Sequence, residues 1–251
     1  MIKLDKVSKK FGTGIFGLSN VSIQVDKGEF LFLIGPTGSG KTTIFRLITR
    51  ETTPTEGSII VSGWDILKLP KEKIPSLRKK IGVVFQDLKL LFDRTIFENI
   101  LLPLEVAGVN SQEAIKKAEE ALNQVGLSSH KDKFPIQLSG GELQRAAIAR
   151  ALVLSPEIIL ADEATGNLDM ATSWEIINLL LDINKKGTTI VMATHNPDFV
   201  KNLEKRVVKM DKGKVVHDSK HKTKKEDLEE DQDKESISPP PNETTEGQGG
   251  K

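Results

Sequence analysis

Apolar and polar residues alternate in the first 50 positions in patterns that predict two strands and a helix. Val21, Ile23 and Val25 alternate with polar residues, as in a half-buried strand, and Lys27-Gly28 predicts the turn that follows. Residues 30–34 are continuously apolar, which is typical of a strand buried on both faces. A glycine-rich loop comes next, and an apolar stripe after it predicts a helix. This stripe consists of Ile44, Phe45, Leu47 and Ile48.

The pattern between residues 111 and 125 predicts a longer amphipathic helix, with Ser111 as its N-cap and Gly126 just past its end. Pro156 is expected to end the next helix, because proline cannot continue one. Apolar positions three and four residues apart would lie on one face of the longer helix. They are Ala114, Ile115, Ala118, Ala121, Leu122 and Val125.

The remaining apolar runs predict further strands at 158–160 and 188–192, and a terminal hairpin. Its strands, 206–210 and 214–217, are joined by the turn Asp211-Lys212-Gly213. Strands that alternate with helices indicate an α/β fold with a mostly parallel core sheet. The segment from about 88 to 155 is then a helical insertion in its middle.

Composition and charge indicate the class of protein and the extent of its folded domain. The 251 residues are 37% apolar with a net charge of +1, so no global field attracts nucleic acid or acidic lipid. Neither a signal peptide nor an apolar run long enough to cross a bilayer is recognisable, which predicts a cytoplasmic protein. From Asp218 onward only Leu228 and Ile237 are large aliphatics. We therefore expect a folded domain over 1–217 and a disordered charged tail over 218–251.

The glycine-rich loop matches the P-loop pattern G-x-x-x-x-G-K-[ST], and it stands between an apolar strand and an apolar-striped helix, as a P-loop does. Glycines let backbone N–H groups turn inward onto phosphate oxygens, and the helix directs its positive end at them. Lys41 would contact the β- and γ-phosphates, and the Thr42 hydroxyl would bind Mg²⁺. A chance glycine-rich turn is the alternative. The expected nucleotide contacts are Gly35, Pro36, Thr37, Gly38, Ser39, Gly40, Lys41, Thr42 and Thr43.

Two carboxylates follow the apolar strand at 158–160. Ligands in open α/β sheets bind at the carboxyl ends of the strands, where Asp162 and Glu163 would lie. Asp162 is suited to hold Mg²⁺, and Glu163 is suited to polarise the attacking water. Many strands end in Asp-Glu, so this pair indicates a catalytic site only because the chain also carries a P-loop.

The segment Leu138-Ser139-Gly140-Gly141-Glu142 resembles the LSGGQ signature of the ATP-binding cassette (ABC) superfamily, with Glu142 in place of Gln. Taken by itself, it is a helix start capped by Ser139, whose free N–H groups suit an anion. The resemblance implies an ABC-type nucleotide-binding domain with an antiparallel β subdomain and a helical subdomain. It also implies ATP hydrolysis by a homodimer, in which each signature completes the nucleotide site of the opposite chain.

Other motifs of the superfamily follow in the expected order, and the resemblance gives each a role. Gln86 looks like the Q-loop glutamine that senses Mg²⁺ and the γ-phosphate, and Asp169 belongs to a D-loop at the dimer interface. His195, just after the strand at 188–192, looks like the switch histidine. Phe11 occupies the position that stacks on adenine, although simple packing is its alternative.

Within the superfamily, the triplet Asp93-Arg94-Thr95 and the stretch Phe134-Pro135-Ile136-Gln137 look like the FtsE group of cell-division ATPases. The resemblance implies an integral membrane partner similar to FtsX, through which the chain is held on the inner face of the plasma membrane to control peptidoglycan hydrolysis. Ala164 departs from the family, where Pro is usual, and is expected to loosen the turn into the D-loop.

Three alternatives stand beside this interpretation. The first is an ATPase subunit for lipoprotein release or macrolide export, whose relatives share residues 165–169. The second is a soluble ABC protein of DNA repair or translation, which the balanced charge disfavours because nucleic-acid binding needs a basic footprint. The third is a catalytically dead cassette, which the presence of Lys41, Asp162, Glu163 and His195 disfavours.

An apolar segment after Gln86 is a candidate for contact with the partner. We expect two of Leu88, Leu90 and Leu91 to belong to the core of the helical insertion. Phe92 is expected to be an exposed anchor, because aromatic anchors dominate protein interfaces.

Overall fold

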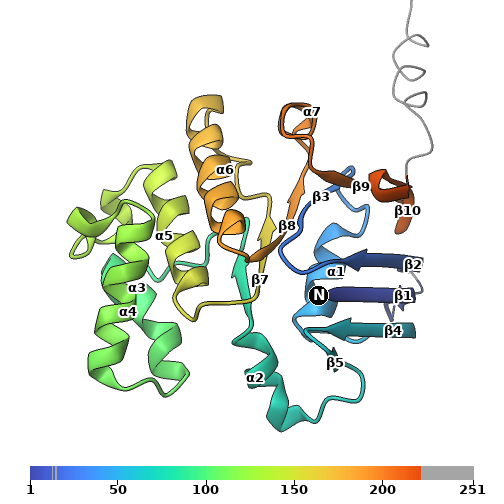
Figure 1. Cartoon of the computed structure of the whole chain (residues 1–251), viewed down its shortest axis with the longest axis horizontal. Coiled ribbons are helices and arrows are strands. Elements are labelled where there is room, and N and C mark those ends of the chain that lie inside the picture. Colours follow the sequence, from blue (N-terminus) through green and yellow to red (C-terminus); the bar gives the residue numbers. More distant parts are fainter. Residues whose placement is uncertain (13, 15, 222–251) are drawn as a thin grey trace, which may run out of the picture. The chain divides into compact units, whose positions relative to one another are not determined.

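A six-stranded sheet forms the centre of the unit Met1–Lys220 in the computed structural model, which describes residues 1–12, 14 and 16–221 (Figure 1). Its strands lie in the order β10-β9-β3-β8-β7-β6, and all neighbours are parallel except the terminal hairpin of β9 and β10. The predicted mostly parallel core sheet is confirmed. The strands are β3 (Phe30–Ile34), β6 (Ile81–Val84), β7 (Ile158–Asp162), β8 (Thr189–Thr194), β9 (Arg206–Asp211) and β10 (Lys214–Asp218).

A second, four-stranded sheet is antiparallel throughout, with the order β2-β1-β4-β5. Val21, Ile23 and Val25 are buried along one face of β2, as their alternation predicts. The antiparallel subdomain that the family resemblance implied is therefore present. Its strands are β1 (Ile2–Lys10), β2 (Phe16–Val25), β4 (Glu56–Val61) and β5 (Trp64–Asp65).

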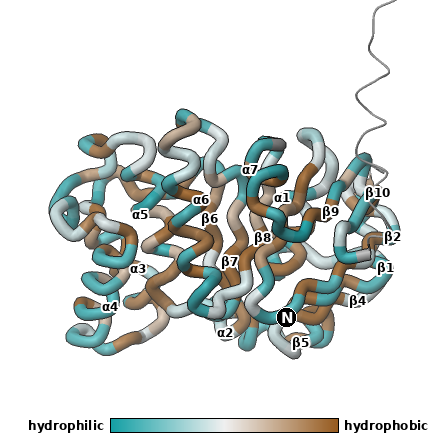
Figure 2. The backbone as a smooth tube through the Cα atoms, turned by 45° about the horizontal axis from the view of Figure 1, so that its top comes forward, coloured by the Kyte–Doolittle hydropathy of each residue, from teal (hydrophilic) through white to brown (hydrophobic). Residues whose placement is uncertain are grey.

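The two faces of the six-stranded sheet belong to separate hydrophobic cores, because neighbouring residues of a strand point to opposite sides. Phe30 and Phe32 of β3 join the core of the helical region, whereas Leu31 and Leu33 join a core shared with helix α1 (Lys41–Ile48) and the antiparallel sheet. Figure 2 shows that hydrophobic residues predominate along β7 and β8. One face thus carries the predicted P-loop helix, and the other carries the helices of the insertion.

The helices over the second face are α3 (Ile96–Val106), α4 (Ser111–Gln124), α5 (Gly140–Leu152) and α6 (Met170–Lys185). The prediction that Ser111 caps α4 is wrong, because the side chain of Asn110 accepts the N–H of Gln112 at 2.9 Å and Ser111 is the first helical residue. Ile115 is also misassigned to the buried stripe, since it is 46% exposed. Gly126 follows the helix with a φ of 73°, as expected of a residue past a helix end.

Short elements complete the unit. Helix α5 ends at Leu152, four residues before the proline expected to end it. The other helices are α2 (Ile74–Arg78) and α7 (Pro197–Asn202), and single 3₁₀ turns lie at Lys71–Lys73, Ser128–His130, Pro135–Gln137 and Ser219–His221.

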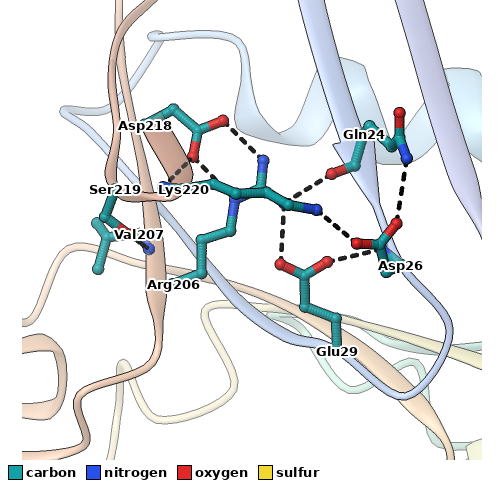
Figure 3. Close-up of polar contacts among 8 residues, drawn as sticks. All are labelled: Gln24, Asp26, Glu29, Arg206, Val207, Asp218, Ser219 and Lys220. Carbon is teal, nitrogen blue, oxygen red and sulfur yellow. Dashed lines mark hydrogen bonds and ion pairs between the residues drawn. The ribbon is translucent and has the colours of Figure 1, made fainter. Parts of the chain in front are cut away.

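The terminal hairpin extends further than its sequence pattern predicted. Lys212 and Gly213 both have positive φ, at 44° and 76°, which suits a two-residue hairpin turn. Strand β10 includes Asp218, whose carboxylate accepts two bonds from the nearly buried guanidinium of Arg206, at 2.8 and 2.7 Å (Figure 3). Asp218 therefore belongs to the folded unit. Residues 222–251 of the predicted tail lie outside the described residues.

Candidate nucleotide site

The loop between β3 and α1 has a backbone that only glycine accepts easily. Gly35 and Gly40 have φ angles of 148° and 107°, and a Cβ on Gly40 would lie 2.7 Å from the carbonyl oxygen of Gly17. Helix α1 begins at Lys41 without a side-chain cap. Its first backbone N–H groups are therefore not satisfied by a capping side chain, and they suit an anion.

Two side chains of this loop are buried with hydrogen-bonding capacity that suits phosphate. The ammonium of Lys41, a residue 7% exposed, donates to the carbonyl oxygens of Gly35 and Pro36 at 2.7 and 3.1 Å. The hydroxyl of Ser39 is buried and has no hydrogen-bond partner within the described part of the chain. These groups fit a nucleotide phosphate, because an anion would satisfy the hydroxyl and pair with the ammonium.

The sheet brings Asp162, at the end of β7, to the first turn of α1. The Thr42 hydroxyl donates to its carboxylate at 3.0 Å. Burial raises the pKa of Asp162, although the bond from Thr42 and the charge of Lys41 act in the opposite direction. A hydroxyl and a carboxylate are the hard oxygen ligands that Mg²⁺ takes beside water and phosphate. The pair could hold that ion.

Glu163 and His195 meet beside this pair, at the ends of β7 and β8. Oε2 of Glu163 lies 2.7 Å from Nδ1 of His195, with the glutamate side chain 13% and the histidine 68% exposed. Glu163 has a φ of 51°, and its N–H donates to the carbonyl of Ala193 at 3.0 Å. A largely buried carboxylate next to an exposed imidazole is an arrangement that can accept and pass on a proton.

Gln86 and Phe11 belong to two separate loops. Gln86 is exposed on the loop after β6, the strand next to β7. Phe11 is 40% exposed, and a Cβ on Gly17 would meet both its ring, at 2.5 Å, and the Thr43 methyl, at 3.4 Å. The ring thus lies beside the start of α1, where an aromatic face can stack on a base.

The signature segment begins helix α5 with a complete capping box. The Ser139 hydroxyl accepts the N–H of Glu142, and the Glu142 carboxylate accepts both the N–H and the hydroxyl of Ser139 at 2.7 Å. These two bonds hold the pKa of Glu142 below its usual range. His130 lies 3.0 Å from the other carboxylate oxygen. The Ser139 N-cap prediction is confirmed.

The D-loop packs directly against the signature. Asp169 caps α6 by accepting the N–H of Thr172 at 3.0 Å and its hydroxyl at 2.6 Å. A Cβ on Gly141 would lie 2.5 Å from the Thr172 methyl, and one on Gly140 would lie 3.2 Å from Leu168. A side chain at Gly141 would therefore clash with Thr172, whereas one at Gly140 would need the end of the Leu168 side chain to give way slightly.

The structure gathers the predicted residues other than Gln86 into two groups on opposite faces of the six-stranded sheet. Phe11, the P-loop, Asp162, Glu163 and His195 form one, near α1. Ser139 to Glu142 with Asp169 form the other, where α5 and α6 start. Sequence reasoning missed Gly17, which makes room for Phe11, and His130, which pairs with Glu142, because neither lies in a recognisable motif.

Comparison with known proteins agrees with this geometry. The ABC transporter family model matches residues 18–166. The cell division ATP-binding protein FtsE of Streptococcus pneumoniae is 47% identical over 218 residues, which are 87% of this chain and 95% of the relative. The methionine import ATP-binding protein MetN of Halalkalibacterium halodurans is 42% identical over 87% of this chain, but the match spans 66% of its own length.

A solved structure shows the same fold. The dimeric, post-hydrolysis ATP-binding cassette MJ0796, bound to ADP and Pi, superposes with a TM-score of 0.79 and 36% identity, over 87% of this chain and 97% of that one. Within residues 1–12, 14 and 16–221, no helix is both long and apolar enough to span a membrane. With a family match over more than half of its residues, the chain belongs to the ABC transporter family of ATP-binding proteins.

Proposed function

We propose that this chain hydrolyses ATP as the nucleotide-binding subunit of an FtsE–FtsX-type complex in bacterial cell division. The contact between Glu163 and His195, beside the Asp162–Thr42 pair and the P-loop, carries the proposal for hydrolysis. The likeness to FtsE over nearly its whole length supports the biological role.

Each side chain of the site has its own role in ATP hydrolysis. Lys41 leaves the loop carbonyls to pair with the β- and γ-phosphates, and the loop amides hold the phosphate chain. Thr42, Asp162 and Gln86 would hold Mg²⁺, which when bound neutralises charge on the phosphates. Glu163 takes the proton of the attacking water, and His195 orients that carboxylate and contacts the γ-phosphate.

The two groups of site residues imply a dimer. Ser139, Gly140 and Asp169 are exposed on the chain that carries them, and they lie on the other face of the sheet from the P-loop helix. A second chain that turns its signature toward this P-loop completes the site. ATP then bridges the two chains, and the dimeric state of the cassette MJ0796 supports this arrangement.

The segment after Gln86 suits contact with an integral membrane subunit. Leu90 is buried and Leu88 packs against the helical core, so two of the three leucines are internal, as expected. Leu91 is 41% and Phe92 60% exposed. This exposed pair is an apolar anchor for an FtsX-like partner, which would hold the chain at the inner face of the plasma membrane.

Phe92→Asp tests this docking, with Val216→Asp as its control because Val216 is similarly exposed, at 56%, on the terminal hairpin. We expect Phe92→Asp to leave ATP hydrolysis and the melting temperature unchanged and to abolish sedimentation with membranes. The control should sediment normally. Sedimentation of Phe92→Asp with membranes would exclude this anchor.

The identity of the co-purifying membrane protein tests the biological role. A four-span protein with a large extracytoplasmic domain, together with filamentous cells on depletion, is the expected result. A lipoprotein-handling or amino-acid-transporting partner would replace the cell-division role and leave the ATPase proposal standing.

A further inference from the structure

The short segment between Gln86 and Phe92 joins the predicted γ-phosphate sensor to the predicted partner anchor, and its backbone is unusual. Leu88 and Lys89 have φ angles of 57° and 54°, in the left-handed backbone region that residues other than glycine rarely adopt. Two successive residues in this region carry a steric cost, because Cβ of each comes close to the following carbonyl oxygen. Such a conformation persists only where its surroundings fix it.

Arg150, near the end of the signature helix α5, supplies one such restraint. Its guanidinium donates Nη1–H to the carbonyl of Lys89 and Nη2–H to the carbonyl of Leu88. The planar fork of arginine matches two adjacent carbonyls in a way that the single ammonium of lysine cannot. Burial lowers the pKa of Arg150, so the guanidinium is held there against a desolvation cost that these two bonds offset.

Asn99 of α3 supplies a second restraint at the other end of the segment. It is fully buried, its carbonyl accepts the N–H of Leu91 at 2.7 Å, and its amide donates to the carbonyls of Leu91 and Thr95 at 2.9 Å. Both restraints come from helices of the insertion. The segment that leaves the core sheet after β6 is thus fastened to α5 and α3.

We infer that Arg150 is a positioning residue that makes this segment and the signature helix move as one body. The 13-residue helix α5 carries Arg150 near one end and the signature Ser139–Glu142 at the other, roughly 16 Å apart at the rise of an α-helix. A displacement of Gln86 toward the γ-phosphate therefore pulls on α5 through Leu88 and Lys89. The signature that serves the opposite nucleotide moves with it.

This inference rests on the proposed role of Gln86 and on dimer formation, and Arg150→Ala tests it. The variant is compared with Arg150→Lys, which keeps the charge but not the fork, and with Lys79→Ala. The Lys79 ammonium also donates to a carbonyl, that of Ala107 at 2.9 Å, away from the segment. Each variant is measured for MgADP affinity by calorimetry, for ATP hydrolysis, and, in a Glu163→Gln background, for MgATP-driven dimer formation.

Arg150→Ala should bind MgADP within about twofold of the unmodified chain, because ADP lacks the γ-phosphate. Its hydrolysis and dimer formation should fall at least about tenfold, the effect of losing roughly 1.4 kcal/mol of coupling. Arg150→Lys should be intermediate, and Lys79→Ala should match the unmodified chain. Unchanged dimer formation in Arg150→Ala would overturn the inference. So would parallel losses of MgADP affinity and melting temperature in both Arg150 variants.

A double-mutant cycle with Gln86→Ala separates positioning from a general loss of structure. If Arg150 acts through Gln86, adding Arg150→Ala to Gln86→Ala should change hydrolysis by less than about twofold. Additive losses would overturn the inference. If the unmodified chain itself neither hydrolyses ATP nor dimerises as Glu163→Gln, the proposed function fails instead, and that outcome is distinct.

Discussion

Two regions of the molecule differ in how well their polar groups are paired. They are the P-loop region, residues 35–43 with Asp162, and the signature region, residues 139–142 with Asp169. In the P-loop region the buried Ser39 hydroxyl has no hydrogen-bond partner among the described residues, the Lys41 ammonium is bonded to carbonyls of its own loop, and burial raises the pKa of Asp162. In the signature region both helix starts are capped. Hydrogen bonds from Ser139 and from Thr172 lower the pKa of Glu142 and of Asp169.

The difference shows where a ligand is needed. Polar groups that are buried without full pairing destabilise the folded chain until an ion and phosphate satisfy them. Groups that are already paired gain little from a ligand and contribute a fixed shape. This difference supports the proposed function, in which the P-loop region would bind nucleotide and metal and the signature region would present a rigid helix start to a nucleotide held by another chain.

Glu163→Gln should produce the largest change in activity. The amide keeps the shape of the side chain but cannot accept a proton, and loss of a general base lowers rates by about 10²–10⁴-fold. ATP binding should survive, so the variant should accumulate as a closed dimer with MgATP on size-exclusion chromatography. A variant that stays monomeric and hydrolyses ATP at the normal rate would exclude Glu163 as the base.

Lys41→Ala should weaken ATP binding by about 10–150-fold, the equivalent of about 1.5–3 kcal/mol for a charge-assisted bond to phosphate. Titration calorimetry with MgATP measures the affinity. Arg46→Ala is a suitable control, because Arg46 is a cation of the same helix that is exposed on its surface. If labelled ATP binds Lys41→Ala normally, the nucleotide lies elsewhere.

The pattern of apolar residues decided which parts of the fold could be predicted from the sequence. Strands β3, β7 and β8 and helix α1 were evident because a buried strand is continuously apolar and a helix carries a stripe. Helix ends were less reliable. Asn110 and Ser111 are both good caps, and only the backbone angle at Asn110 decides between them. Ile115 shows that an apolar residue at the edge of a stripe can face solvent.

Sequence motifs indicated the candidate site, but they did not indicate the long-range hydrogen bonds around it. Lys41, Asp162 and Glu163 were found because their spacing and the strands before them are local in sequence. The bonds from Arg150 to Leu88 and Lys89 join residues more than 60 positions apart, and the buried Asn99 carries no motif. Such contacts depend on packing of the helices, which periodicity does not fix.

Ser139→Arg should separate the two regions functionally. The bulky side chain would stand where the nucleotide of the opposite chain docks, so a monomer should bind ATP normally while dimer formation in a Glu163→Gln background is lost. The change also removes an N-cap, at a cost of about 1 kcal/mol. Ser139→Ala removes the cap without the bulk and controls for that loss. Undiminished cooperative ATPase activity in Ser139→Arg would refute the composite site.

The smallest effects, on the stability of the nucleotide-free chain, test the comparison directly. Asp162→Asn and Glu142→Gln each remove one negative charge and keep the side-chain shape, but they should act with opposite signs at pH 7. A carboxyl whose pKa is raised by folding penalises the folded state above that pKa, so Asp162→Asn should raise the melting temperature by about 1–4 °C. A carboxyl whose pKa is lowered stabilises it there, so Glu142→Gln should lower the melting temperature by about 1–3 °C.

The pH dependence follows from the same linkage. The stability that Glu142 supplies is present above its unfolded pKa and disappears as the pH falls through its lower folded pKa. The penalty at Asp162 is present above its raised folded pKa and disappears as the pH falls to the unfolded value. Once both carboxyls are protonated, each variant should melt with the unmodified chain. Thermal melts from pH 7 down into the acid range in which both carboxyls are protonated measure both differences. Shifts of the same sign at pH 7 would show that the two regions do not differ in the way their pKa shifts indicate.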